Sequence, residues 1–96
     1  MRKLDPALER RRNERNGPRR VCELVVGELV YPATIVDTSR GGLFVLTEAP
    51  AERGVPVSVL EKGDERLAVV VHVRRPARSL LRVTTGGLGL RWLLPH

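Results

Sequence analysis

Short stretches in which apolar and polar residues alternate make up most of the chain after residue 19. A period of two residues is typical of strands that bury one face. Six such stretches are separated by turn residues, a spacing that favours a small, closed antiparallel barrel. The predicted strands lie within residues 21–28, 29–37, 43–47, 55–61, 66–74 and 86–94.

The connections between these stretches carry turn residues. Gly27-Glu28 predicts a tight turn, and the Lys-Gly-Asp run at 62–64 predicts a hairpin. Pro32 has no backbone donor, so we expect it at an edge position or a bulge. Residues 48–54 are expected to form a loop, whereas residues 76–85 are compatible with a loop or a strand extension.

The alternation also predicts which side chains face inward. The strongest strand should turn Leu67, Val69, Val71 and Val73 to one face, with His72 on the opposite surface. The same reasoning gives further inward positions, including the single cysteine and two of the three aromatic residues. These are Cys22, Leu24, Val26, Phe44, Leu88, Leu90 and Trp92.

Positive charge is concentrated at the start of the chain. Of 17 basic and 11 acidic side chains, residues 1–20 carry eight and three, and the net charge is +6. We therefore predict a mobile, arginine-rich segment over residues 1–18 and a barrel over residues 19–96. A basic segment of this kind indicates an anionic partner: a nucleotide, a nucleic acid or a membrane surface.

Several kinds of protein are disfavoured. One cysteine and two histidines allow no internal disulfide and no zinc site of the usual ligand number. No apolar run approaches the roughly 18 residues of a membrane span, and no secretory signal follows the basic start. We expect a cytoplasmic protein without membrane insertion, without a cofactor and without enzymatic activity, because no nucleophile is placed beside a base.

One polar stretch just before an apolar strand carries candidate chemistry: Asp37-Thr-Ser39-Arg-Gly41-Gly42. It is compatible with a simple turn, in which Asp and Ser bond the backbone and glycine supplies positive φ. It is also suited to a ligand. Asp37 and Ser39 would point the same way at the barrel mouth, and the glycines would admit a ligand close to the backbone. A carboxylate there matches the two N–H donors on the Watson–Crick edge of guanine.

A second motif, Arg11-x-x-x-Arg15, lies in the basic segment. Arginines four residues apart are expected by chance in so basic a run. Guanidinium groups nevertheless pair with phosphate, bind the O6/N7 edge of guanine and stack on bases. The two motifs together would satisfy a guanine nucleotide. Arg15-x-x-x-Arg19 is a rival frame for the same pattern.

In these motifs the chain resembles a PilZ domain, from about Arg10 to Trp92. That family carries RxxxR in a mobile N-terminal segment and (D/N)xSxxG some twenty residues later, on a six-stranded barrel. The runs "GGLFV" and "GGLGLRW" are similar to the family as well. The resemblance implies a stand-alone receptor or adaptor domain that binds cyclic di-GMP. Because residues 1–18 have few apolar groups and arginines that repel one another, we further predict that the ligand orders this segment and so signals to a downstream protein partner. The implied ligand-binding residues are Arg10, Arg11, Arg15, Asp37, Ser39, Gly41 and Gly42.

Two other functions remain open from the sequence. A nucleic-acid-binding barrel is allowed by the charge. Single-strand binding uses aromatic platforms, however, and the chain has only three aromatic residues, which disfavours nucleic acid as a partner. A barrel that binds only protein is the other. Many PilZ domains continue into a C-terminal helix, and in its absence a dimer or partner contact would cover the barrel end.

Overall fold

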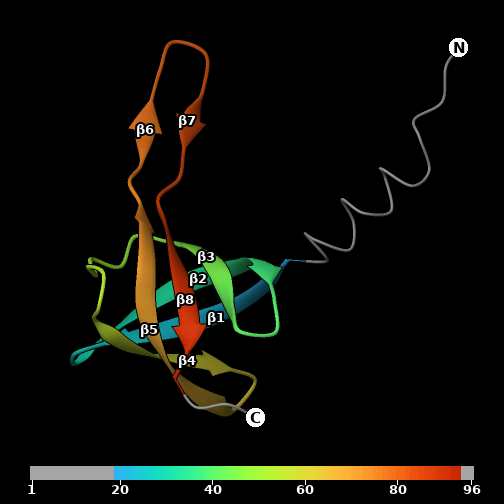
Figure 1. Ribbon diagram of the computed structural model, residues 1–96. Coiled ribbons are helices and arrows are strands. Elements are labelled where there is room, and N and C mark those ends of the chain that lie inside the picture. The colour runs from blue at the N-terminus through green and yellow to red at the C-terminus, as the bar shows by residue number, and fades with distance from the viewer. Residues whose placement is uncertain (1–18, 94–96) are drawn as a thin grey trace, which may run out of the picture.

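The computed structural model of the chain describes residues 19–93. Six antiparallel strands form a closed barrel in the order β1-β2-β3-β8-β5-β4 (Figure 1). A separate two-stranded sheet, β6–β7, extends from it. The strands are β1 (Arg20–Val26), β2 (Leu29–Thr38), β3 (Gly42–Thr47), β4 (Pro56–Glu61), β5 (Asp64–Arg74), β6 (Ala77–Arg78), β7 (Val83–Thr84) and β8 (Gly87–Trp92). The prediction of an all-β fold with a six-stranded barrel is confirmed.

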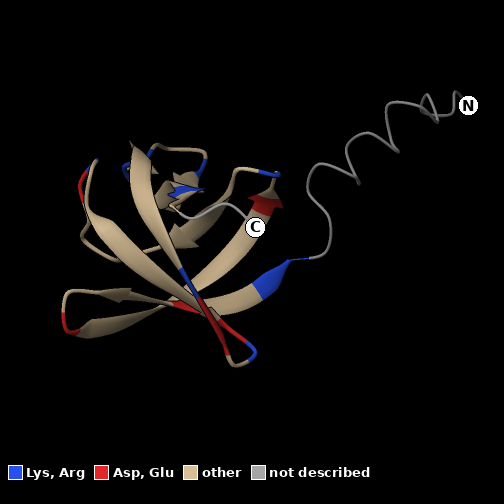
Figure 2. Cartoon of the chain, turned by 60° about the horizontal axis from the view of Figure 1, so that its bottom comes forward, with Lys and Arg blue, Asp and Glu red and all other residues tan. Residues whose placement is uncertain are grey.

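The barrel interior is filled by small and branched apolar side chains. Leu24, Val45, Val57 and Val70 are fully buried, one from each of four strands. Pairing between β1 and β4 closes the cylinder, so every strand of the barrel has two neighbours. Closure removes the free edges that would otherwise limit so small a sheet. Many of the charged residues lie at strand ends and turns (Figure 2).

The predicted turns form as their residues dictate. Gly27 adopts a φ of 64° between β1 and β2, and both Lys62 (53°) and Gly63 (86°) have positive φ in the β4–β5 hairpin. Two positive φ values match the twist of the flanking strands. Pro32 sits at a local edge, because the β2–β3 ladder begins one residue later, at Ala33 opposite Thr47. The Thr47 hydroxyl instead donates to the Pro32 carbonyl, at 2.9 Å.

The prediction for the inner face of β5 is wrong. Ala68 and Val70 point into the barrel, whereas Leu67 and Val71 are exposed. The ladder to β8 skips Val71, and this bulge returns Val73 to the core side. An almost continuous apolar run has two faces that look alike, so alternation did not identify the inner one. His72 is exposed on the outside, as predicted.

Residues 74–85 form an arm that leaves the barrel. The arm extends beyond the ends of β5 and β8, and within it β6 and β7 pair through Ala77–Thr84 and Arg78–Val83 (Figure 1). Of the two possibilities left open for this stretch, the structure shows the strand extension. Arg74 fixes the base of the arm, since its Nε and Nη2 donate to the Thr85 carbonyl at 3.2 and 2.8 Å.

Candidate functional site

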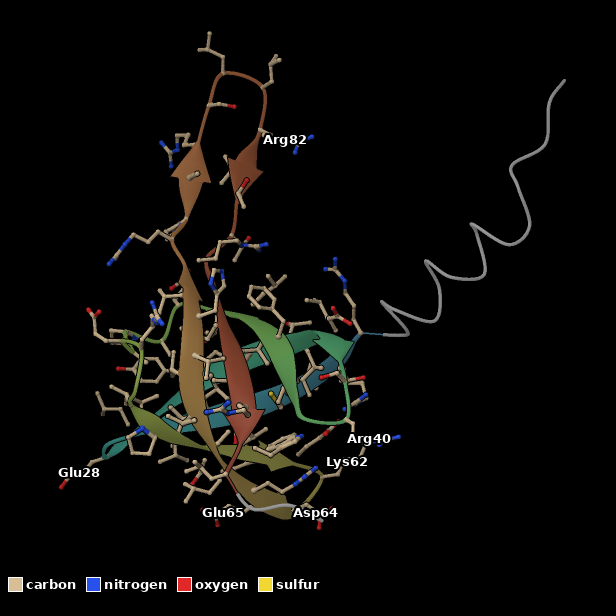
Figure 3. The ribbon with its side chains drawn as sticks, viewed as in Figure 1. Glu28, Arg40, Lys62, Asp64, Glu65 and Arg82 are labelled. Atoms are coloured by element: carbon tan, nitrogen blue, oxygen red, sulfur yellow. The ribbon has the colours of Figure 1, made fainter. Side chains whose placement is uncertain are left out.

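The Asp37–Gly42 motif forms the end of β2, a tight turn and the first residue of β3. The Ser39 amide donates to the Gly42 carbonyl at 2.9 Å, and the Gly42 amide donates back at 3.4 Å. Arg40 and Gly41 therefore occupy the turn itself, and Figure 3 shows Arg40 pointing away from the barrel. The turn is held to the last barrel strand by the Trp92 amide, which donates to the Gly41 carbonyl.

A β-bulge turns Asp37 outward. Ile35 pairs with Val45, and both are buried, but the next pair is Asp37 with Phe44, so Val36 is the extra residue. Without the bulge, strict alternation would place Asp37 on the same inner face as Ile35. With it, the carboxylate shares the outer face with Phe44. Bulges of this kind often redirect a side chain at a functional site.

Four strands contribute to one row on this outer face. Asp37 on β2 lies opposite Phe44 on β3, Phe44 lies opposite Gly89 on β8, and Gly89 lies opposite His72 on β5. We call these four residues the outer row. The Phe44 and His72 rings are 6.4 Å apart, centroid to centroid, across Gly89. A carboxylate, an aromatic ring and an imidazole are thus presented side by side.

Glycines on β8 make space for the aromatic ring. A Cβ on Gly87 would lie 2.7 Å from the Phe44 ring, and a Cβ on Gly89 would lie 3.0 Å from His72 Cβ. The Arg74 guanidinium lies on the ring, with its Cζ 5.0 Å from the centroid. The prediction that Phe44 belongs to the core is therefore wrong: the ring is half-buried on the outside. Trp92 is half-buried too, but it packs against the core.

Two grooves flank Asp37 and Phe44. The first, the arginine groove, has a volume of about 360 Å³ and is lined by Arg19, Val36, Asp37, Phe44, Leu46 and Arg74. The second, the turn groove, has a volume of about 400 Å³ and includes Asp37, Ser39, Gly41, Phe44, Gly89 and Arg91. Each groove combines the Asp37 carboxylate and the Phe44 ring with arginine. This combination suits a ligand that carries a base and an anionic group.

The structure places the predicted motif residues as follows. Asp37 and Ser39 both line the turn groove, but Asp37 lies on the outer wall rather than at the barrel mouth. Neither Gly41 nor Gly42 has positive φ. Gly42 is needed for strand packing, because its Cβ would lie 1.9 Å from the Leu90 carbonyl oxygen, whereas a Cβ on Gly41 would meet nothing within 4 Å. Arg10, Arg11 and Arg15 lie outside the described residues.

Phe44, His72, Arg74 and Gly89 were missed as site residues. Phe44 and Gly89 share their strands with core residues, and their outward direction becomes visible only from the register. A signal for Arg74 was present in the sequence, because an arginine at the end of a long strand is suited to the rim of a site. Its place beside Phe44 depends on which strands become neighbours, and β5 and β3 are separated in the barrel by β8.

The barrel end near the turn holds a different arrangement. A cavity of about 250 Å³ there is lined by Ser39, Glu61, Arg66 and Trp92, among others. Arg20 donates to the Glu61 carboxylate, which lowers the pKa of Glu61 and raises that of Arg20. The Arg66 guanidinium stacks on Trp92, 3.7 Å from the ring centroid. The Arg66 Nε is buried there without a hydrogen-bond partner among the described residues, but Glu61 and Asp64 line the same cavity, and their negative charges make this end a weaker candidate for an anionic ligand than the outer row.

The sequence of the chain was compared with models of known protein families. The sequence profile described as PilZ domain matches residues 9–95. The chain belongs to the PilZ domain family. No curated protein and no solved structure matches it. The match begins ahead of Arg10, Arg11 and Arg15, so the arginine segment and the Asp37–Gly42 turn fall inside one family domain.

PilZ domains are cyclic di-GMP receptors and are not enzymes. The resemblance stated from the sequence is therefore confirmed. Among residues 19–93, no cluster of histidine, cysteine and acidic side chains could hold a metal ion. The same part of the chain contains no helix that could cross a membrane.

Proposed function

We propose that this PilZ domain binds cyclic di-GMP on the outer wall of the barrel, at the outer row. One observation carries the proposal: the bulge at Val36 places the Asp37 carboxylate opposite Phe44, between two grooves that arginines line. A turn that served only to connect β2 and β3 would not require this redirection. The family supports the ligand, and the geometry supports the position.

The outer row offers what a guanine base requires. The Asp37 carboxylate accepts two hydrogen bonds, from N1–H and from the exocyclic amino group. The Phe44 ring and the Arg74 guanidinium that lies on it together provide a surface on which the base stacks, and a base–aromatic contact is worth about 1–3 kcal/mol in single-stranded nucleic acid complexes. Gly89 places no side chain between the Phe44 and His72 rings, and Ser39 and Gly41 border the turn groove within reach of a ribose or phosphate.

Arginines supply the charge that the two phosphates need. Arg19 and Arg74 line the arginine groove, and Arg74 keeps further N–H donors free after its two bonds to Thr85. Arg15 precedes Arg19 by four residues, so it lies within about 14 Å of it along the chain. Arg11 and Arg15 are therefore proposed to bind phosphate and guanine from the N-terminal side. Arg10 would stack on a second nucleotide.

Signalling follows from this division of the site. The ligand would join arginines of residues 10–15 to Asp37 on the barrel wall, and so fix the N-terminal segment against the barrel. Ordering of a segment by a bound anion costs entropy but creates a surface that is absent without the ligand. We propose that this surface is what a downstream protein partner recognises.

Calorimetry with cyclic di-GMP tests the proposal. Asp37→Asn should weaken binding by roughly ten- to hundredfold, because a hydrogen bond to a charged group contributes about 1.5–3 kcal/mol. Glu28→Gln is the matched control. It makes the same chemical change in the β1–β2 turn, away from Arg40 and the site (Figure 3), and should leave binding unchanged. GMP and GTP should bind more weakly than cyclic di-GMP. Equal losses in both variants, or equal affinity for GTP, would contradict the proposal.

The arginine frame is tested separately. Arg11→Ala and Arg15→Ala should each weaken binding by roughly ten- to hundredfold, and Arg2→Ala should have little effect. Arg19→Ala is informative because Arg19 lines the arginine groove. If Arg19→Ala were as harmful as Arg15→Ala while Arg11→Ala had no effect, the rival frame would be the correct one.

Trypsin measures the proposed ordering. Cyclic di-GMP should slow cleavage around residues 10–15 strongly. Cleavage in the exposed arm, after Arg78 and Arg82, should be the same with or without the ligand and serves as the internal control. Unchanged cleavage at saturating ligand would show that the N-terminal segment does not take part in the site.

A further inference from the structure

The tip of the arm is the most exposed apolar feature of the described residues. Leu80 and Leu81 form the β6–β7 turn with relative exposures of 103% and 94%, and Val83 beside them is 69% exposed. Apolar side chains at the end of a projecting ribbon do not pack against the barrel core, so they contribute nothing to its stability. Such a feature usually marks a contact with another molecule.

All the charged residues of the arm are basic. Residues 74–85 include Arg74, Arg75, Arg78 and Arg82 and no acidic residue. Arg78 and Arg82 stand one or two residues behind the leucines, so they lie within about 7 Å of them along the strands. Figure 3 shows Arg82 on the arm just behind its tip. From the tip toward the barrel, the arm therefore presents first an apolar layer and then a layer of positive charge.

We propose that the arm is a membrane contact, in which Leu80 and Leu81 enter the surface of an anionic phospholipid bilayer while Arg78 and Arg82 bind its headgroups. The layering agrees with that of a bilayer, whose polar region is about 5–8 Å deep on each side of the hydrocarbon. Basic side chains near an anionic surface and buried apolar area both contribute to such binding. This proposal is independent of the nucleotide site.

The backbone of the tip is suited to an apolar environment. The Ser79 hydroxyl oxygen accepts hydrogen bonds from the Leu81 amide at 3.3 Å and from the Arg82 amide at 3.2 Å. The Ser79 amide donates to the Arg82 carbonyl at 2.8 Å. Backbone donors that lack a partner are costly in lipid, so these bonds to the Ser79, Leu81 and Arg82 amides lower the cost of entering the interface.

A bilayer fits the tip better than the other occupants do. A second copy would bring four arginines of one arm against four of another. A protein would need a deep apolar groove with an acidic rim to receive a convex tip, whereas an anionic bilayer has this layering over its whole surface. Such a contact also differs from a membrane-spanning segment, which needs about 20 apolar residues. The proposal departs from the expectation of no membrane insertion, which rested on the lack of a long apolar run.

Vesicle co-sedimentation of the full chain tests the proposal. The protein should bind vesicles of phosphatidylcholine with roughly one-third phosphatidylglycerol more tightly than phosphatidylcholine alone. Leu80→Ser with Leu81→Ser should weaken this binding at least about tenfold, and Arg78→Gln with Arg82→Gln roughly thirtyfold. The melting temperature should not change in the leucine variant, because both side chains are already exposed.

The β1–β2 turn provides the matched control. Leu29 and Val30 are also exposed, at 61% and 54%, but they follow Glu28 instead of arginines. Leu29→Ser with Val30→Ser should change vesicle binding by less than about twofold. Binding carried by the basic residues 1–20 alone would be insensitive to the tip leucines. Unchanged binding in the Leu80/Leu81 variant would therefore overturn the proposal, as would equal binding to both kinds of vesicle.

A fluorescent probe reports on the tip directly. A polarity-sensitive dye on Leu81→Cys should shift to the blue when anionic vesicles are added, and the same dye on Val30→Cys should not. Cys22 does not compete for the dye, because it is buried and its burial raises the pKa of the thiol to about 11. If the dye on Leu81→Cys reported a polar environment while the protein was bound to vesicles, the membrane contact would be wrong. The tip would then be expected to bind a groove on a partner protein.

Discussion

The β2–β3 hairpin and the β6–β7 arm are both short antiparallel ribbons, but they differ in their neighbours. β2 pairs with β1, and β3 pairs with β8, so the first hairpin is held on both sides by the barrel. β6 and β7 pair only with each other, through two residue pairs. An isolated two-stranded ribbon is marginally stable in water.

The difference indicates what each hairpin is suited to do. Side chains on the supported hairpin have fixed positions, so Asp37 and Phe44 can present a defined pattern of donors, acceptors and ring surface to a small ligand. The arm gains little from its own pairing, and its apolar tip becomes useful only against another surface. One hairpin is therefore suited to specific recognition, and the other to attachment.

The largest expected effect is at the turn of the supported hairpin. Gly42→Ala should destabilise the fold by at least about 3 kcal/mol, because its Cβ would lie 1.9 Å from the Leu90 carbonyl oxygen and β3 would have to move away from β8. Gly41→Ala, one residue earlier, should change the free energy of unfolding by less than about 0.5 kcal/mol. Urea denaturation of both variants measures this. Similar losses would show that the turn, rather than strand packing, requires glycine.

An intermediate effect is expected at Phe44. Phe44→Ala should weaken cyclic di-GMP binding roughly tenfold or more, because a stacking contact of about 1–3 kcal/mol is lost. Leu80→Ala, which also removes an exposed apolar side chain, should leave the affinity unchanged. Calorimetry on the two variants compares the hairpins directly. If the arm variant lost as much affinity as Phe44→Ala, the division between recognition and attachment would be wrong.

The smallest effect is expected in the arm. Ser79→Ala removes an acceptor from two backbone amides at an exposed turn, where water can replace it, so the free energy of unfolding should change by less than about 0.5 kcal/mol. Hydrogen exchange at Leu81 and Arg82 should nevertheless become faster, since the arm can open without the barrel. A large global loss would mean that the arm is coupled to the barrel core.

The sequence predicted the barrel well because most of its strands expose one face and bury the other. Cys22, Leu24, Leu88 and Leu90 are buried as their alternation requires. Prediction failed where alternation is interrupted or ambiguous. The bulge at Val36 reverses the direction of Asp37, and the apolar residues on both faces of β5 hide its inner side.

The candidate site was predicted only in part, for a related reason. Asp37 and Ser39 carry recognisable chemistry close together in the chain, so a local motif identified them. Phe44, Gly89 and His72 meet through the register of three different strands, which no local pattern contains. Arg10, Arg11 and Arg15 lie outside the described residues, so their part in the site stays a prediction.

The central claim is that cyclic di-GMP binds at the outer row, and an NMR titration of the isotope-labelled chain tests it most directly. The amides of Asp37, Ser39, Phe44, Gly89 and His72 should shift as the ligand is added, while those of Leu80 and Leu81 should not. Changes confined to the arm, or to the barrel end around Asp64 and Arg66, would contradict the account.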